Sequence, residues 1–178
     1  FHERVLKEGK GLDHFPAELH YSQWAAEKAV HFIEEQPENQ PFFCKLSFFD
    51  PHDPYLDYPE EMAESVKAEL LPPIQSEYEG TVPIPDGVRR ERDRPLCPRG
   101  PDAEQRLKAI RTGYYASIAF IDRQIGKVLQ SVEEKGLAEK TLVLFVSDHG
   151  DMLGEKQLLT KGAYFYDPSV KVPFLMKY

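Results

Sequence analysis

The chain contains few cysteines, no excess of basic residues and no long apolar run, and each of these absences excludes a class of protein. Two cysteines among 178 residues cannot build a disulfide framework, and they do not show the ligand spacing of a zinc site. The net charge of −8 argues against a nucleic acid partner, because phosphates demand clustered cations. No apolar run is long enough to span a bilayer, so we expect neither a transmembrane segment nor a membrane partner.

The remaining composition is that of a folded globular chain of single-domain length, with 41% hydrophobic and 29% charged residues. The chain begins at Phe1 without an initiator methionine and stops at Tyr178, directly after an apolar run from Val172 that has the composition of a strand. We therefore expect it to be a piece of a longer polypeptide. The sequence predicts neither a cellular compartment nor an oligomeric state.

Two apolar runs predict strands, and an acidic residue follows each. Residues 142–146 are apolar without interruption, which is typical of a strand buried on both faces of a parallel sheet. Residues 42–49 form a second run, rich in aromatic residues, in which we expect Cys44 to be a small core residue.

Two segments with helical spacing complete the fold prediction. Residues 18–35 carry an apolar side. Residues 102–135 carry the stronger pattern, and Gly136 suits a left-handed helix end. The apolar residues of this second segment recur at steps of three or four: Leu107, Ile110, Tyr114, Ile118, Ile121, Ile125, Val128 and Val132. The order of helices and strands predicts an α/β fold with a mainly parallel sheet and covering helices.

Residues 58–101 hold most of the prolines and show no sustained period. This composition predicts a loop-rich segment with a short helix near residues 60–69. A basic run at 89–94 is interleaved with acidic residues and followed by Pro95, so we interpret it as a solvated loop, with an anion site as the alternative.

Asp148 and His149 directly follow the strand predicted at 142–147, at the edge of an open α/β sheet where ligands usually bind. A carboxylate and an imidazole together can bind a divalent cation, and Gly150 allows the backbone to turn sharply. The alternative is that Asp148 caps a following turn and that His149 is an ordinary loop residue.

His52 lies in a loop that Pro51 and Pro54 stiffen, after the run at 42–49. A histidine held in this way can act as a positioned acid or contact an oxyanion. The alternative is a rigid turn whose imidazole faces solvent. The remaining histidines stand in ordinary contexts and receive no functional interpretation: His2, His14, His20 and His31.

Lys161 precedes Gly162 and an aromatic cluster, where its ammonium could meet an anionic ligand, although a lone lysine is usually a surface charge. If the two predicted strands are close in the sheet, His52 converges on one face with Asp148 and His149. A metal, a lysine and a histidine around one pocket suit a tetrahedral anion, which favours cleavage of sulfate or phosphate esters over carbonyl chemistry.

These residues resemble motifs of the sulfatases, a family within the alkaline phosphatase superfamily. The segment 147–154 resembles the family's second metal-binding motif, and 161–173 is similar to its lysine segment. The segment 46–55 matches its proline-framed histidine, and 114–122 resembles the helix before the metal-binding strand. The resemblance begins near residue 18 and leaves only 62–101 unmatched.

The resemblance implies an alkaline phosphatase-like sandwich, here partial, and a role for each motif residue. Asp148 and His149 would be ligands of a single divalent cation, usually calcium. His149 stands where many members have asparagine, and imidazole suits manganese better, so manganese and magnesium stay open. Lys161 would bind a sulfate oxygen. His52 would contact the sulfate and help the leaving alcohol take a proton.

The family's nucleophile, a formylglycine made from cysteine within a Cys-x-Pro-x-Arg motif, has no counterpart in this chain. Near Cys97, Pro98 and Arg99 follow too closely, and the segment lies on the wrong side of His52, so we reject it. We therefore expect residues 1–178 to be the central part of a sulfatase catalytic domain, with a loop-rich insertion at about 62–101. Such a piece holds about half of the site and should be inactive alone.

The expected function of the parent protein is metal-dependent hydrolysis of a small anionic sulfate ester. Two alternatives remain open. One is hydrolysis of phosphonate monoesters or phosphodiesters within the same superfamily, and the other is a non-catalytic homologue.

Overall fold

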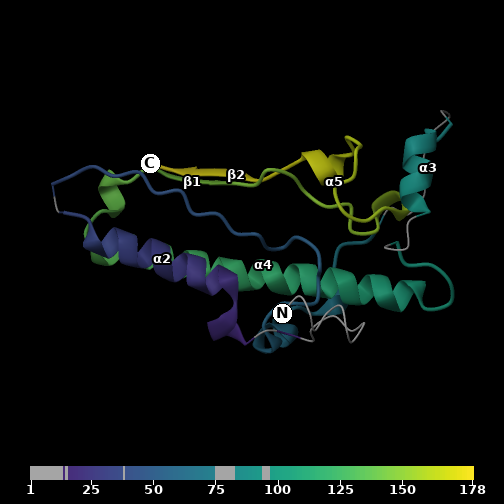
Figure 1. Cartoon of the computed structure of the whole chain (residues 1–178), viewed down its shortest axis with the longest axis horizontal. Coiled ribbons are helices and arrows are strands. Elements are labelled where there is room, and N and C mark those ends of the chain that lie inside the picture. Colours follow the sequence, from purple (N-terminus) through teal and green to yellow (C-terminus); the bar gives the residue numbers. More distant parts are fainter. Residues whose placement is uncertain (1–13, 15, 38, 75–82, 94–96) are drawn as a thin grey trace. The chain divides into compact units, whose positions relative to one another are not determined.

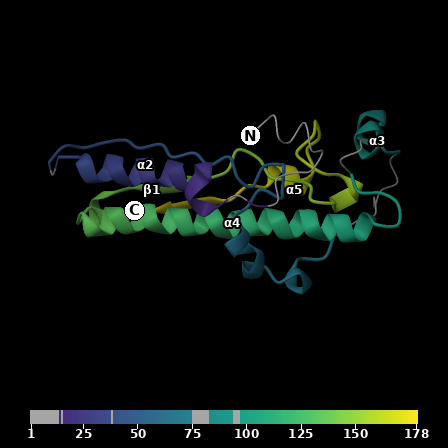
Figure 2. The same ribbon diagram turned by 60° about the horizontal axis from the view of Figure 1, so that its bottom comes forward.

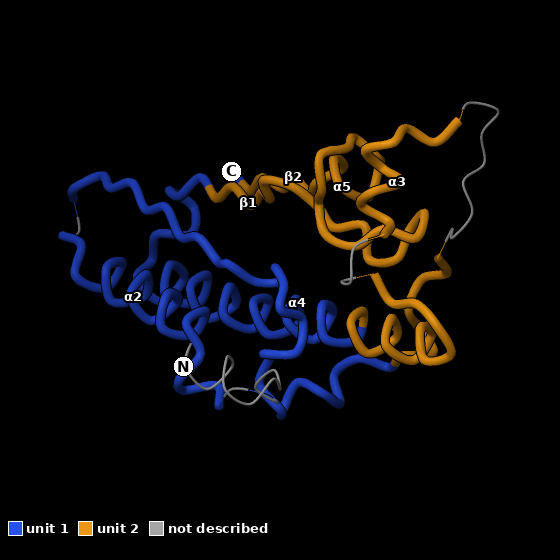
Figure 3. Tube along the Cα trace, turned by 45° about the vertical axis from the view of Figure 1, so that its right-hand side comes forward, with its two compact units in different colours: residues 1–67, 112–142, 178 blue, residues 68–111, 143–177 orange. Residues whose placement is uncertain are grey.

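The computed structural model describes residues 14, 16–37, 39–74, 83–93 and 97–178, whose helices and strands are labelled in Figure 1. The chain divides into two compact units, coloured separately in Figure 3. Unit 1 comprises residues 1–67, 112–142 and 178. Unit 2 comprises residues 68–111 and 143–177.

The long helix α4, Ala103–Glu134, contributes its first residues to unit 2 and the rest to unit 1. The helix predicted over 102–135 is thereby confirmed. Its buried positions include Ala116, Phe120 and Ile121, which repeat at the spacing of one helix face. Gly136 follows the helix with a φ of 69°, the left-handed conformation that the sequence predicted for this end.

Helix α2, Tyr21–Glu35, follows a short 3-10 turn at Ala17–Leu19 and confirms the helix predicted over 18–35. It lies beside the unit 1 part of α4, as Figures 1 and 2 both show. Ala26, Ala29 and Ile33 are buried, so the small apolar face of α2 is the packed one. His20 caps the helix, because its Nδ1 accepts a hydrogen bond from the Ser22 amide at 3.2 Å.

The core of unit 1 forms where the segment that follows α2 packs against α4. Tyr58 and Met62 pack with Ala116 and Phe120 of the helix. Gly113 permits the close approach, since a Cβ on it would lie 1.9 Å from the Tyr55 carbonyl oxygen. The 3-10 helix at Glu60–Ser65 and another at Ala68–Leu70 confirm the short helix predicted near 60–69.

The strand predicted over residues 42–49 is wrong for this structure, which assigns these residues to no strand. Cys44 is exposed, so its prediction as a core residue is also wrong. A strand is held by hydrogen bonds to a neighbouring strand, and no described strand pairs with this segment.

Strands β1, Val143–Val146, and β2, Phe174–Lys177, form the sheet of unit 2. They are antiparallel, in a register that pairs Val143 with Lys177 and Val146 with Phe174. The strand predicted over residues 142–147 is confirmed as β1. Its burial on both faces is wrong, because Leu144 is 54% exposed. Within the part of the chain that the structure describes, this sheet of two strands has no further strands beside it. The described residues form only this antiparallel pair, so the mainly parallel sheet stays a prediction.

A helix occupies part of the segment predicted as a solvated loop. Helix α3, Asp86–Arg92, buries Val88 against Met152 and Leu158. Arg92 Nε donates a hydrogen bond to the Lys156 carbonyl oxygen at 2.9 Å. The solvated-loop interpretation is therefore wrong for Arg92, while residues 94–96 lie outside the described residues.

The other short elements are 3-10 helices at Ala138–Lys140 and Glu155–Gln157 and the helix α5, Asp167–Val170. None of the described helices is long and apolar enough to cross a membrane.

Candidate active site

Asp148 and His149 lie just beyond β1, separated from its last residue, Val146, by Ser147. The Asp148 Oδ1 atom accepts a hydrogen bond from the His149 amide at 2.9 Å, and its Oδ2 lies 3.7 Å from His149 Nε2. The Asp148 side chain is 86% exposed and that of His149 is 31% exposed. The pair therefore turns an oxygen and an imidazole nitrogen toward each other at an accessible position.

The contacts of His149 define which ring nitrogen carries the proton. Its Nδ1 lies 2.8 Å from the Gly150 carbonyl oxygen, and a carbonyl can only accept, so Nδ1 is the protonated donor. Nε2 then carries the lone pair. The Lys161 ammonium lies 3.0 Å from this Nε2 and donates to it.

A closed loop between His149 and Lys161 brings these two side chains together. Asp151 Oδ1 accepts from the Leu153 amide at 2.9 Å and from the Thr160 amide at 3.1 Å, which joins the two ends of the loop. The Asp151 carboxylate thus has a structural role in the turn. Met152 and Leu158 are the buried anchors of the loop, packed with Val88 of α3.

Gly150 allows a close approach of two backbone segments in unit 2. Its amide donates to the Ser169 carbonyl at 2.8 Å, and a Cβ on Gly150 would lie 2.0 Å from the Pro168 carbonyl oxygen. The Ser169 hydroxyl in turn donates to the Lys161 carbonyl at 3.1 Å. These contacts attach the segment after β1 to α5 and to the backbone of Lys161.

His52 belongs to unit 1, where its ring is held by its neighbours. His52 Nδ1 lies 3.0 Å from the Asp53 carbonyl oxygen and 2.9 Å from Asp53 Oδ1, so Nδ1 is the protonated donor. The Phe49 ring lies 4.7 Å from the imidazole. The His52 side chain is 30% exposed, which makes it accessible to a ligand.

Sequence reasoning missed a buried polar cluster beside the His52 loop. The Ser22 hydroxyl donates to Asp50 Oδ2 at 2.5 Å, and His20 Nδ1 lies 3.8 Å from the same oxygen. All three residues are at most 6% exposed. The available signal in the sequence was Asp50, the acidic residue directly before Pro51.

The electrostatics of this cluster follow from burial. Burial lowers the pKa of His20, opposed by the Asp50 carboxylate and a hydrogen bond to the Asp57 backbone. Burial, together with the charge of Asp50, raises the pKa of Asp57 to about 6. The Asp57 Oδ1 atom is buried without a hydrogen-bond partner, which accounts for the cost of ionising that carboxyl. Burial also raises the pKa of Tyr21, whose hydroxyl is hydrogen-bonded to Asp50.

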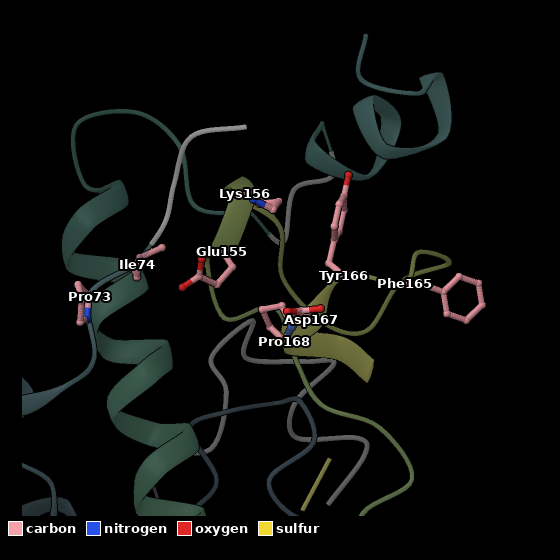
Figure 4. A pocket seen from close by; sticks show the side chains of 8 residues that line it. All are labelled: Pro73, Ile74, Glu155, Lys156, Phe165, Tyr166, Asp167 and Pro168. Atoms are coloured by element: carbon pink, nitrogen blue, oxygen red, sulfur yellow. The ribbon is translucent and has the colours of Figure 1, made fainter. Parts of the chain in front are cut away.

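An open cavity of about 760 Å³ lies elsewhere in unit 2 (Figure 4). Its charged lining comes from Glu155, Lys156 and Asp167, and the Lys156 ammonium lies 5.9 Å from the centre of the Tyr166 ring. Phe165 is 92% exposed at its rim. None of the predicted site residues lines this cavity, so its chemistry is separate from that of the His149 pair.

The described residues contain no group of three or more histidine, cysteine or acidic side chains arranged to hold a metal ion. Asp148 and His149 nevertheless suit two positions of a larger ligand set. Ligating histidines usually donate their second ring N–H to a carbonyl, as His149 Nδ1 does to Gly150. A cation on Nε2 would displace Lys161 from that lone pair, because one lone pair serves one partner.

The structure thus brings together three of the four predicted site residues, Asp148, His149 and Lys161, within unit 2. His52 lies in unit 1, and its convergence with the other three stays a prediction. The rejected cysteine, Cys97, is buried, and its thiol lies 3.7 Å from the Glu91 carbonyl oxygen.

Comparison with known proteins identifies relatives across nearly the whole chain. The model of the family described as Sulfatase matches residues 7–178. An arylsulfatase of Clostridium perfringens is 36% identical over 159 residues, which cover 89% of this chain and 32% of that protein. The human iduronate 2-sulfatase is 30% identical over 162 residues, covering 85% of this chain and 29% of that protein. The chain therefore spans about a third of the length of the curated relatives that it matches.

Solved structures of related enzymes also resemble this chain. A phosphonate monoester hydrolase of Agrobacterium radiobacter aligns with a TM-score of 0.72 at 25% identity, covering 91% of this chain and 34% of that one. A putative sulfatase of Bacteroides fragilis aligns with a TM-score of 0.63 at 25% identity, covering 88% and 30%. The alkaline phosphatase-like fold expected from the sequence is thereby supported at the level of its neighbours.

Proposed function

The chain belongs to the sulfatase family, and from this membership we propose that the polypeptide containing it hydrolyses sulfate esters. The observation that supports the proposal most directly is the contact of Lys161 with His149 beside Asp148. It gathers an ammonium, an imidazole and a carboxylate at one strand end. An ammonium that can reach an oxyanion, next to two groups able to bind a cation, suits a dianionic or monoanionic ester.

Each of the four residues then has a role in the proposed reaction. Asp148 and His149 would hold one divalent cation, which when bound supplies positive charge to the sulfate oxygens. Lys161 would bind a second sulfate oxygen through its ammonium. His52 would contact the sulfate and deliver a proton to the oxygen of the departing alcohol.

The geometry of His52 supports its proposed role as an acid. Asp53 accepts a hydrogen bond from Nδ1 through its carbonyl and carboxylate oxygens, which orients the ring. Nε2 is then the nitrogen that would transfer a proton to the alcohol oxygen. Delivering that proton removes the need to expel a free alkoxide, and this lowers the barrier most for poor leaving groups.

The identity of the metal ion depends on its two proposed ligands. Carboxylate oxygen suits calcium, magnesium and manganese, whereas imidazole favours manganese over calcium. We propose calcium as the resident ion because it is the usual ion of the family, with manganese or magnesium as alternatives that the imidazole ligand keeps open. Elemental analysis of the purified polypeptide decides between them, because each ion is measured directly.

The remaining ligands and the nucleophile are proposed to lie outside this chain. Cys97 is buried and contacts the backbone of α3, which supports a structural role for it. We accordingly propose that residues 1–178 are the central part of a sulfatase catalytic domain, with a loop-rich insertion at about 62–101. A polypeptide restricted to these residues should bind no substrate productively and turn over none.

A phosphonate or phosphodiester substrate is the second candidate, and a specific observation favours it. The phosphonate monoester hydrolase named above shares the fold over 91% of this chain. Both ester classes present tetrahedral anions, so the residues described here suit either.

The deciding experiment compares turnover of 4-nitrophenyl sulfate with that of 4-nitrophenyl phenylphosphonate by the polypeptide that contains this chain. The shared leaving group makes the comparison one of sulfur against phosphorus. We expect a higher kcat/KM for the sulfate. A higher value for the phosphonate would replace the first proposal by the second, and turnover of neither would support a non-catalytic homologue.

A further inference from the structure

The loop that carries His52 is attached to the beginning of α2 by buried polar contacts, and this attachment has no role in the reaction as described so far. Asp50 lies two residues before His52 and is 6% exposed. Its Oδ2 accepts the Ser22 hydroxyl hydrogen bond at 2.5 Å. Tyr21 also contributes a side-chain hydrogen bond to Asp50.

A second line of contacts runs through aromatic rings. The Tyr21 ring lies 6.0 Å from the Phe49 ring in an edge arrangement, and Phe49 lies 4.7 Å from the His52 ring. The Phe49 carbonyl also accepts the His52 amide hydrogen bond at 3.2 Å. Tyr21 and Ser22 of α2 therefore contact Phe49 and Asp50, the two residues that precede Pro51.

The beginning of α2 is itself packed and capped. His20 is 2% exposed, caps the helix through the Ser22 amide, and lies 4.9 Å from the Phe120 ring of α4. Ser22 is completely buried. A carboxylate that accepts hydrogen bonds from such a buried helix start is restricted in orientation, because charge-assisted bonds are strong and directional.

We infer that Tyr21 and Ser22 are positioning residues, which hold Asp50 and Phe49 so that His52 is oriented to protonate the leaving alcohol. This inference rests on the sulfate ester hydrolysis proposed above. The pair acts through His52 and does not touch substrate. Loss of either hydroxyl leaves the ring present but less well oriented, which affects proton delivery more than ester binding.

The experiment uses the polypeptide that contains this chain and compares Ser22→Ala and Tyr21→Phe with Ser131→Ala. Ser131 is a matched control, because it is a buried unit 1 serine whose hydroxyl donates only within α4, to the Val128 carbonyl at 2.8 Å. Two substrates are used. 4-Nitrophenyl sulfate releases a good leaving group that needs little protonation, whereas an alkyl sulfate needs a proton.

A positioned acid supplies about 100-fold or more to a step that needs its proton. We therefore expect both α2 variants to lose about tenfold in kcat on the alkyl sulfate and less than about threefold on 4-nitrophenyl sulfate. Their KM values should stay within about twofold of the wild-type values. Ser131→Ala should change both substrates equally. An equal loss on both substrates in the α2 variants, with a lowered Tm, would reduce Tyr21 and Ser22 to structural residues and overturn the inference.

A second measurement keeps the inference separate from the proposed function. In protein labelled with ¹⁵N-histidine, the His52 ring signals, assigned through His52→Gln, should shift in Ser22→Ala and Tyr21→Phe but stay unchanged in Ser131→Ala. If the wild-type polypeptide cleaves no sulfate ester, the proposed function and the proton-delivery role fail together, whatever the ring signals show. Sulfate turnover with unshifted His52 signals overturns the positioning inference alone.

Discussion

The Lys161 ammonium lies 3.0 Å from His149 Nε2, while His149 Nδ1 donates to the Gly150 carbonyl at 2.8 Å. Two residues twelve positions apart thus form one unit, in which the lysine is held by the imidazole lone pair. The relationship explains how a lysine on a surface loop acquires a defined place beside Asp148. It also places the proposed anion-binding and cation-binding groups in direct contact.

Replacing Lys161 with alanine should weaken sulfate binding without loosening the fold. A charge-assisted hydrogen bond contributes about 1.5–3 kcal/mol, so KM for a sulfate ester should rise by about tenfold or more. The Tm should remain within about 1 °C, because the side chain is exposed. Lys171→Ala is the matched control, since that lysine is exposed and pairs only with Asp167 nearby. Unchanged kinetics in Lys161→Ala would remove this lysine from the site.

Replacing Asp148 with alanine should abolish metal binding in the polypeptide that contains this chain. The carboxylate is one of two cation ligands that the described residues offer, and the loss of one ligand typically lowers metal affinity severely. Metal content measured by mass spectrometry should fall from about one ion per molecule to a small fraction. Asp86→Ala, at an exposed carboxylate paired with Arg89, should retain the ion. Normal metal content in Asp148→Ala contradicts the assignment.

Replacing Asp57 with asparagine should stabilise the protein at neutral pH. The pKa of Asp57 is raised by burial from 3.8 to about 6, so the folded state holds its proton more tightly than the unfolded state does. The wild type therefore loses stability relative to the variant as pH rises from about 4 to 6, and the difference stays constant above that window. Urea unfolding at pH 4, 5, 6 and 7.5 measures it. A difference that does not grow over this window would argue against a buried neutral carboxyl.

Replacing Gly113 with alanine should destabilise unit 1, because the new Cβ would lie 1.9 Å from the Tyr55 carbonyl oxygen. The resulting displacement of the chain should cost about 1–3 kcal/mol of unfolding free energy. Gly126→Ala on the same helix is the matched control, since nothing lies within 4 Å of its Cβ position. That variant should gain about 0.5–1 kcal/mol from helix propensity. Equal effects of the two substitutions would disprove the close packing of Tyr55 on α4.

Local patterns in the sequence were sufficient for the two long helices and for the position of Asp148 and His149. The stripe from Leu107 to Val132 predicted α4 within one residue at each end, because an amphipathic repeat of that length has few alternatives. The acid and imidazole after an apolar run correctly placed Asp148 and His149 at the end of β1. The short α3 was missed, since seven residues between prolines carry too little periodicity to reveal a helix that Val88 stabilises by tertiary packing.

The sequence by itself determined the family, the two long helices and the identity of the groups that carry charge, because these depend on residue type and spacing along the chain. Tertiary structure alone decided that Lys161 meets His149 and that Ser22 meets Asp50, since both contacts join segments that no local repeat relates. It also decided that residues 42–49 are assigned to no strand, because strand pairing requires a partner that the segment's own composition does not provide.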